Sequence, residues 1–383
     1  MNMNLFVDLV LINPPKIKEL VYDTTLEIHM NNLVANLNYF RSLLNPKTKI
    51  MAMVKAFSYG LGTYDVAKLL EENKVDYLGV ANIYEGVELR KSGIKLPIMV
   101  MKPEIESFNL AVENNLTPAI FSIYALKNLI RSLKNEPLAI SLKIDSGMHR
   151  LGFDDQEIPE LISILKEHSN LKIESVFSHL AATDEIEHDN FTNQQILVFK
   201  NIAESISNQF DYYIDKHILN SNGIIRFNNA QFDMVRLGIG LYGVCSEPNS
   251  QNQLLPASSL KSKIAQIKQI KKGESVGYNR MGKASDNMTI ATIPVGYADG
   301  LSRTLGNGNW NMLINGKKAP IVGNVCMDMV MINITDINCV EGDEVYVFSK
   351  ANPITEMAKV IGTIPYEILT SYSPRVKRVF QYK

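Results

Sequence analysis

The segment KIMAMVKA at residues 49–56 is a short apolar run with a lysine, Lys55, at its end. Seven further apolar runs follow, separated by longer stretches of mixed polarity such as YDVAKLLEENK (64–74), whose apolar residues recur at helical spacing. Apolar strands that alternate with amphipathic helices indicate parallel βαβ units. The other runs are VDYLGVAN (75–82), LPIMVM (96–101), PAIFSI (118–123), LAISLKID (138–145), IESVFSHL (173–180), HILNSN (217–222) and FDMVRLGIGLYG (232–243).

Eight such runs predict an N-terminal (β/α)8 barrel over residues 26–250. Eight strands close this fold, and its usual length is roughly 250 residues. An open doubly wound sheet is the alternative. That fold more often carries a GxGxxG loop after its first strand, and no such loop follows Val54. Residues 1–25 are expected to form an N-terminal extension.

The composition changes at CSEPNSQNQLLPASS (245–259), which is rich in Ser, Asn, Gln and Pro and is interpreted as a linker. Short β-like runs follow, separated by glycine or Asn/Asp turns, so a mainly β C-terminal domain is expected over residues 251–383. These runs are LKSKIAQIKQI, MTIATIPVG, WNMLING, KAPIVG, MVMINIT and DEVYVFS.

The overall charge balance argues against several partners. The 383 residues contain 39 Lys and Arg against 40 Asp and Glu, which is no basic excess of the kind that binds nucleic acid or anionic membranes. No apolar run approaches the 18 or more residues of a membrane span, and the N-terminus is a poor secretory signal. Three cysteines are too few for a disulfide framework. We therefore expect a cytoplasmic protein that acts on a small molecule.

Charged side chains stand at the ends of two predicted strands, where a barrel places its reactive groups. Lys55 ends the first run, and burial would favour its neutral, nucleophilic amine. The alternative is a solvated lysine at a strand end. Lys143, Asp145 and Arg150 lie at the end of the fifth run, and an ion-pair network without catalytic function is the alternative there.

The last strands of the predicted barrel end in residues that could hold a phosphate. Hydroxyl and backbone N–H groups at this place are the usual phosphate site of such barrels, and Ser221, Gly238 and Ile239 would supply them. The alternative is a tight turn that needs glycine. His179 ends the sixth run, where a structural role is the alternative. The six histidines show no metal-ligand spacing, so no catalytic metal is expected.

Nine segments of the chain, in order, resemble the alanine racemase family, and the likeness runs from about Leu26 to the C-terminus. The family is similar in plan to the organisation predicted above, a (β/α)8 barrel followed by a mainly β domain, and its members depend on pyridoxal 5'-phosphate (PLP). This chain departs from the family at Leu61, where a histidine is usual. The segments are KAFSYG (55–60), KIDSGMHRLGF (143–153), FSHLAATDE (177–185), NSNGIIRF (220–227), FDMVRLGIGLYG (232–243), VGYNRMG (276–282), IPVGYADGLSR (293–303), IVGNVCMDMVMI (321–332) and SYSPRVKR (371–378).

The resemblance implies the cofactor contacts. Lys55 would bind PLP as a Schiff base, and Arg236 would contact the pyridine nitrogen with His179 nearby. Arg150 would contact the phenolic oxygen of PLP and the substrate carboxylate, and Lys143, the family's carbamylated lysine, would orient Arg150. The phosphate would be held by Tyr59, Ser221, Gly238, Ile239 and Tyr372.

The resemblance also implies the activity. The expected reaction is the interconversion of L- and D-alanine, with Lys55 and Tyr278 as bases on opposite faces of the substrate, to supply D-alanine for peptidoglycan. Met327 and Asp328 would line the substrate carboxylate site and Tyr297 its entry. Because Tyr278 lies in the second domain and must reach a barrel mouth, the family's homodimer with composite active sites is expected.

Three alternatives stay open. A decarboxylase on the same two-domain plan would carry an acidic residue in place of Arg236, and a racemase of another small amino acid such as serine would differ only in pocket shape. A PLP-carrying barrel without enzymatic activity would have a single domain, against which Tyr278 and residues 260–383 count.

Overall fold

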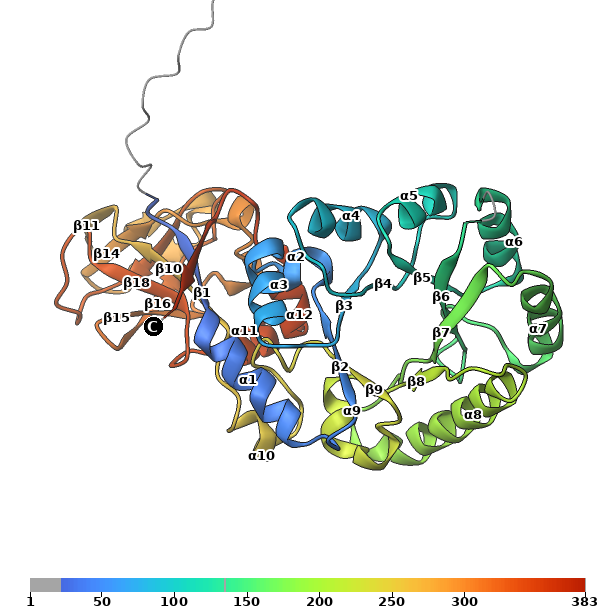
Figure 1. Cartoon of the computed structure of the whole chain (residues 1–383). Coiled ribbons are helices and arrows are strands. Elements are labelled where there is room, and N and C mark those ends of the chain that lie inside the picture. The colour runs from blue at the N-terminus through green and yellow to red at the C-terminus, as the bar shows by residue number, and fades with distance from the viewer. Residues whose placement is uncertain (1–21, 134–135, 383) are drawn as a thin grey trace, which may run out of the picture.

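A computed structural model describes residues 22–133 and 136–382 of the chain, and Figure 1 shows a barrel beside a β-rich domain. The barrel sheet has eight strands in the order β8-β7-β6-β5-β4-β3-β2-β9. Neighbouring strands in this sheet pair parallel to one another. The strands are β2 (Lys49–Met53), β3 (Tyr77–Val80), β4 (Ile98–Val100), β5 (Thr117–Ile120), β6 (Leu138–Lys143), β7 (Leu171–Phe177), β8 (Asp215–His217) and β9 (Met234–Leu237).

The barrel is nearly closed by contacts between residues far apart in the chain. β9 pairs with β2, and the seam between β8 and β9 is bridged by Asp233 N donating to Lys216 O (3.1 Å) and Arg236 N donating to Leu219 O (3.0 Å). The predicted barrel fold is therefore confirmed. The seventh predicted strand, 217–222, is corrected: β8 ends at His217, because the Asn220 side chain accepts from Gly223 N (2.8 Å) and begins a helix.

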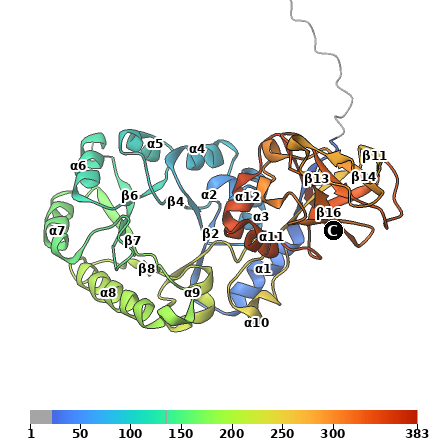
Figure 2. The same ribbon diagram turned by 180° about the vertical axis from the view of Figure 1, so that it is seen from behind.

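Helices cover the outside of the barrel, as Figure 2 shows from behind. In α3, Val66, Ala67, Leu69 and Leu70 form the buried face that the sequence pattern predicts. The helices are α1 (Met30–Ser42), α2 (Lys55–Tyr59), α3 (Thr63–Glu72), α4 (Ile83–Lys91), α5 (Phe108–Glu113), α6 (Ile123–Ser132), α7 (Ile158–Glu167), α8 (Asp189–Ser207), α9 (Ser221–Arg226), α10 (Pro248–Gln251), α11 (Ile354–Ile361) and α12 (Pro365–Ser371).

The C-terminal domain is mainly β, as predicted, and is built on a nine-stranded sheet in the order β11-β14-β17-β16-β15-β18-β10-β1-β19. A two-stranded sheet, β12-β13, lies beside it. Five of the six runs predicted from the sequence each form one strand of the larger sheet, and LKSKIAQIKQI (260–270) is divided between β10 and β11. The strands are β10 (Ser258–Lys263), β11 (Gln266–Ile270), β12 (Ser275–Val276), β13 (Gly282–Lys283), β14 (Met288–Ile293), β15 (Asn311–Ile314), β16 (Lys317–Val322), β17 (Val330–Asn333), β18 (Glu344–Phe348) and β19 (Lys377–Gln381).

The first described strand, β1 (Thr25–His29), belongs to this C-terminal sheet and not to the barrel domain expected over 26–250. It pairs antiparallel with β10 and parallel with β19. Leu26 and Ile28 are fully buried, which is the period of two expected for a strand with one face in a core. The described chain thus passes through the C-terminal sheet at β1 before it forms the barrel. No helix in the described residues is long and apolar enough to cross a membrane.

Candidate active site

A cavity of about 370 Å³ lies at the carboxyl ends of the barrel strands. Its wall contains nine of the side chains and glycines predicted from the sequence, which follow five different strands. This is the end of a barrel at which catalytic groups collect. The lining residues are Met53, Lys55, Tyr59, Ala81, Met101, Lys102, Lys143, Arg150, Leu151, His179, Asn220, Ser221, Arg236, Gly238, Ile239 and Tyr366.

Lys55 enters this cavity from an unusual turn. Ala56, Phe57, Ser58 and Tyr59, none of them glycine, all have positive φ angles between 51° and 60°. Left-handed backbone costs a residue with a side chain roughly 1–2 kcal/mol, so the turn must be held by its surroundings. Gly60 ends the turn at φ 85°, where an added Cβ would lie only 2.1 Å from the carbonyl oxygen of Leu369 in α12.

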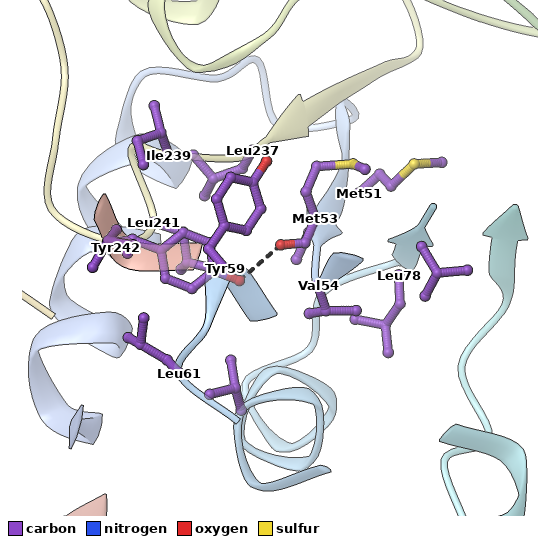
Figure 3. Close-up of a cluster of buried hydrophobic side chains, with 14 of the residues drawn as sticks. Met51, Met53, Val54, Tyr59, Leu61, Leu78, Leu237, Ile239, Leu241 and Tyr242 are labelled. Carbon is purple, nitrogen blue, oxygen red and sulfur yellow. Dashed lines mark hydrogen bonds between the residues drawn. The ribbon is translucent and has the colours of Figure 1, made fainter. Parts of the chain in front are cut away.

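Aromatic packing holds the far end of this turn. The rings of Tyr59 and Tyr242 lie 4.6 Å apart, and the Tyr242 hydroxyl donates to the Met53 carbonyl (2.8 Å), the dashed line in Figure 3. Burial raises the pKa of the Tyr59 hydroxyl above its usual value. Tyr59 is thus a neutral hydroxyl at the cavity wall.

Arg236 lies fully enclosed at the cavity, where acceptors surround its guanidinium. Its Nη2 donates to Ser178 O (2.6 Å), Ile218 O (3.0 Å) and His179 Nδ1 (3.2 Å). Its Nη1 donates to His217 Nδ1 (2.7 Å). Among the described residues its Nε–H has no acceptor, so this donor is available to a ligand in the cavity. No carboxylate of the described chain forms an ion pair with it.

His217 is a residue of this site that the sequence analysis missed. Burial and the Arg236 charge hold the pKa of His217 well below its usual value. Its ring stacks on Phe177 at 5.1 Å, and its Nε2 lies 3.1 Å from Ser175 Oγ. The signal in the sequence was a histidine at the start of the apolar run 217–222.

The cavity gathers five cationic side chains: Lys55, Lys102, Lys143, Arg150 and Arg236. Within the described residues only Lys102 forms an ion pair. Burial, then the charges of Arg236 and Arg150, lower the pKa of Lys143 to about 7. Burial, then Arg150, also lowers the pKa of Lys55. A cavity with this excess of positive charge favours an anionic ligand.

One corner of the cavity has the shape of a small anion site. A Cβ added to Gly238 would lie 3.0 Å from the Tyr59 hydroxyl and 3.8 Å from Ser221 Oγ. Ser221 Oγ accepts from Gly238 N (2.9 Å) and Gly240 N (3.1 Å), so its own hydrogen can point elsewhere. Two hydroxyls thus meet around a glycine whose missing side chain leaves room for a ligand.

Tyr372, which the sequence analysis assigned to this site, does not line the cavity, whereas Tyr366 does. Tyr366 lies in α12, lines the cavity and packs on Tyr59 with ring centroids 5.8 Å apart. Tyr372 caps the end of the same helix and packs on Phe348, and its buried hydroxyl has no partner among the described residues. The helix turns the two tyrosines to different sides.

The remaining predicted residues lie on the surface of the C-terminal domain. Tyr278, Met327 and Asp328 line a separate cavity of about 700 Å³, and the Tyr278 side chain is 70% exposed. Tyr297 lies near them, because its backbone N–H donates to the Cys326 carbonyl (3.0 Å). Within one chain these residues and Lys55 therefore occupy different cavities.

Asp328 is held in this surface by a chain of ion pairs. Its carboxylate accepts from Arg375 Nη2 (2.6 Å), and Arg375 Nε donates to the buried Asp299 (2.6 Å). Asp299 in turn accepts from Gly296 N (2.8 Å) beside Tyr297. The described chain contains no cluster of three or more His, Cys, Asp or Glu side chains able to hold a metal ion.

Comparison with known families agrees with this arrangement. The family described as "Alanine racemase, N-terminal domain" matches residues 28–246, and "Alanine racemase, C-terminal domain" matches residues 257–380. The chain belongs to the alanine racemase family. The two matched segments coincide with the barrel and with most of the C-terminal sheet.

Individual alanine racemases are similar over nearly the whole chain. "Alanine racemase 2" of Caldanaerobacter subterraneus is 38% identical over 94% of this chain and 95% of its own length. The solved alanine racemase of Clostridium difficile 630 superposes with a TM-score of 0.88 at 36% identity, covering 95% of this chain and 97% of that one. That of Bartonella henselae (TM-score 0.86, 29% identity, 94% and 100% covered) contains covalently bound pyridoxal phosphate.

Proposed function

We propose that this chain is a PLP-dependent isomerase that interconverts L- and D-alanine, with Lys55 and Tyr278 as its two bases. The observation that carries the proposal is the environment of Arg236, which lines the cavity and whose Nε–H has no acceptor among the described residues. A guanidinium donates and never accepts. A group that binds to it must therefore be an acceptor, such as an unprotonated pyridine nitrogen.

The residues of the cavity fit PLP. The corner between Tyr59, Ser221 and Gly238 suits its phosphate, and Ile239 N–H, which has no acceptor among the described residues, can add a further donor. Arg236 suits the ring nitrogen at the opposite side, and the Lys55 amine, with its lowered pKa, suits the covalent attachment. When bound, PLP supplies an electron sink that stabilises negative charge at the substrate Cα.

Arg236 favours racemisation over decarboxylation. By keeping a proton off the ring nitrogen it limits how far negative charge is drawn from Cα, which restrains side reactions. An acidic residue at this position would hold a proton on that nitrogen. Lys143 lines the cavity with Arg150 and, as a carbamate, would orient the Arg150 side chain that would bind the substrate carboxylate.

Racemisation requires acid–base groups on both faces of Cα, since a proton leaves one face and another returns to the opposite face. The Lys55 amine serves one face. Tyr278 serves the other from a second copy of the chain, because within one chain it lines a different cavity. Met327 and Asp328 of that copy would line the substrate carboxylate site, and Tyr297 its entry. The active form is therefore a homodimer with composite sites, located in the cytoplasm, where its product D-alanine supplies peptidoglycan synthesis.

The test is to incubate the purified protein with PLP and L-alanine in heavy water. We expect the optical rotation to fall to zero while deuterium enters Cα. Retained rotation with fully bound cofactor would overturn the proposal. Parallel reactions with L-serine and with basic amino acids, followed by rotation and by release of carbon dioxide, separate alanine from other substrates and from decarboxylation.

A further inference from the structure

The turn after Lys55 is strained, and the backbone hydrogen bonds inside it are donated by residues from Ser58 onward, not by Ala56. Ser58 N donates to Val54 O (3.0 Å) and Gly60 N to Ala56 O (2.9 Å) inside the turn. The far end is also fixed from outside, by Arg378 Nε donating to Gly60 O (3.1 Å). Four left-handed residues persist only where the surroundings determine their conformation. The near end, next to Lys55, needs an anchor of its own.

Glu85 is that anchor. Its Oε1 accepts a hydrogen bond from the backbone N–H of Ala56 (2.8 Å), the residue that follows Lys55. Its Oε2 accepts from Ala81 N (2.7 Å), directly after β3. One carboxylate thus joins the ends of two neighbouring barrel strands. Hydrogen bonds to an ionised acceptor are about twice as strong as neutral ones.

Glu85 is itself fixed in position. It lies in the first turn of α4, where the Asn82 side chain accepts from Glu85 N (2.9 Å) and caps the helix. The Glu85 side chain is half-buried, and each of its two carboxylate oxygens accepts from a backbone N–H group. A rigid helix end therefore sets the place of the Ala56 amide.

We propose that Glu85 is a positioning residue for Lys55: its carboxylate holds the Ala56 amide and thereby fixes the backbone from which the Lys55 amine reaches the reacting atoms. The inference rests on the proposed function, in which Lys55 carries the cofactor and acts as a base. Glu85 touches neither substrate nor cofactor and acts through Lys55 alone.

The charge of Glu85 has a second effect on Lys55. Burial, Arg150 and Arg236 all lower the pKa of the Lys55 amine, and Glu85 is the acidic group that raises it. Loss of that charge would lower the pKa of Lys55 further. The role of Glu85 can therefore be measured in two ways, by the rigidity of the backbone at Ala56 and by the pKa of the Lys55 amine.

The test compares Glu85→Gln with Glu88→Gln, both as holoenzymes. Glu88 lies one turn further along α4, is exposed and pairs only with Lys91 on the surface. Gln at 85 keeps one acceptor, loses the charge and leaves one of the two amides without a good partner. We expect kcat to fall about 10- to 100-fold with KM for alanine little changed, and the acid limb of the pH profile to move to lower pH. Glu88→Gln should resemble the wild type.

Two further readouts do not depend on turnover. Hydrogen exchange of the segment 54–60 should be faster in Glu85→Gln than in Glu88→Gln, and the pH midpoint of the visible band of the bound cofactor should move to lower pH. Glu85→Asp, which keeps the charge, should retain the wild-type midpoint.

The outcomes separate this inference from the proposed function. If the wild type racemises alanine while Glu85→Gln keeps its kcat, pH profile and exchange rate, the positioning role is overturned. A variant that only melts earlier, with an unchanged pH profile and band midpoint, would also overturn it. If the wild type does not racemise alanine, the proposed function fails, and exchange at residues 54–60 still decides whether Glu85 holds the turn.

Discussion

Arg236 donates from its Nη1 to the Nδ1 of His217 over 2.7 Å, and both side chains are buried. Because arginine cannot accept, this imidazole nitrogen carries no proton, and the ring hydrogen lies on the Nε2 that faces Ser175. His217 is therefore a neutral acceptor that leaves the full positive charge on Arg236. The pair therefore leaves Arg236 as a permanently charged donor in the wall of the barrel cavity.

Arg236→Glu should therefore change the products of the reaction. A carboxylate would hold a proton on the ring nitrogen and strengthen the electron sink, so transamination should increase relative to racemisation. Pyruvate formed per alanine racemised measures this ratio. Arg131→Glu, an exposed arginine of α6, is the control, and an unchanged ratio in folded Arg236→Glu protein would contradict the role of Arg236.

Lys55→Ala should abolish covalent attachment of PLP. We expect the absorption band of the bound cofactor at the edge of the visible range to disappear after dialysis, together with racemisation. Lys102→Ala removes a lysine at the rim of the same cavity and should keep the band. A band that survives dialysis of the Lys55→Ala protein would place the attachment elsewhere.

Tyr278→Phe should affect the two enantiomers unequally. The phenol serves one face of Cα only, so its removal should slow Cα–deuterium exchange from one enantiomer at least about tenfold more than from the other. Exchange of L- and D-alanine in heavy water, followed by NMR, gives both rates. Tyr124→Phe, on the exposed side of α6, is the control; an equal loss for both enantiomers would contradict the division between two bases.

Gly238→Ala should weaken cofactor binding while the protein still folds. The added methyl group would lie 3.0 Å from the Tyr59 hydroxyl, in the space assigned to the phosphate. We expect the dissociation constant for PLP to rise about tenfold or more, equivalent to roughly 1.4 kcal/mol, when measured by fluorescence titration. Thermal unfolding of the cofactor-free variant should stay close to the wild type, and unchanged PLP affinity would count against this phosphate site.

Lys143 should make the stability of the cofactor-free protein depend on pH. Burial and the charges of Arg236 and Arg150 lower its pKa from the usual 10.5 of a lysine amine to about 7 in the folded chain. Between these values the unfolded chain binds one more proton, so folding stability rises with pH over this interval. In carbonate-free buffer, the free energy of unfolding should rise between pH 7 and pH 10 by about a few kcal/mol more in the wild type than in Lys143→Met. Parallel pH profiles of the two proteins would contradict the buried neutral amine.

Much of the site was predictable because it depends on strand ends. The apolar runs mark the strands, and the residues after them, such as Lys55, Ser221 and Arg236, must meet at one end of a closed parallel barrel. The prediction failed at β8, where the helix cap at Asn220 shortens an otherwise continuous run. It also missed Glu85, whose position in a helix pattern resembles that of any surface glutamate, such as Glu88.

Local patterns in the sequence determined the eight strands, the β character of the second domain and the set of cationic residues at the barrel mouth, because these depend on burial periods and residue order. Tertiary contacts alone decided the rest. The left-handed turn opposes the preferences of its own four residues and exists because Glu85, Leu369 and Arg378 enclose it. Tyr366, and not Tyr372, lines the barrel cavity because α12 packs against the turn at Gly60, a contact between segments far apart in the chain that no local preference contains.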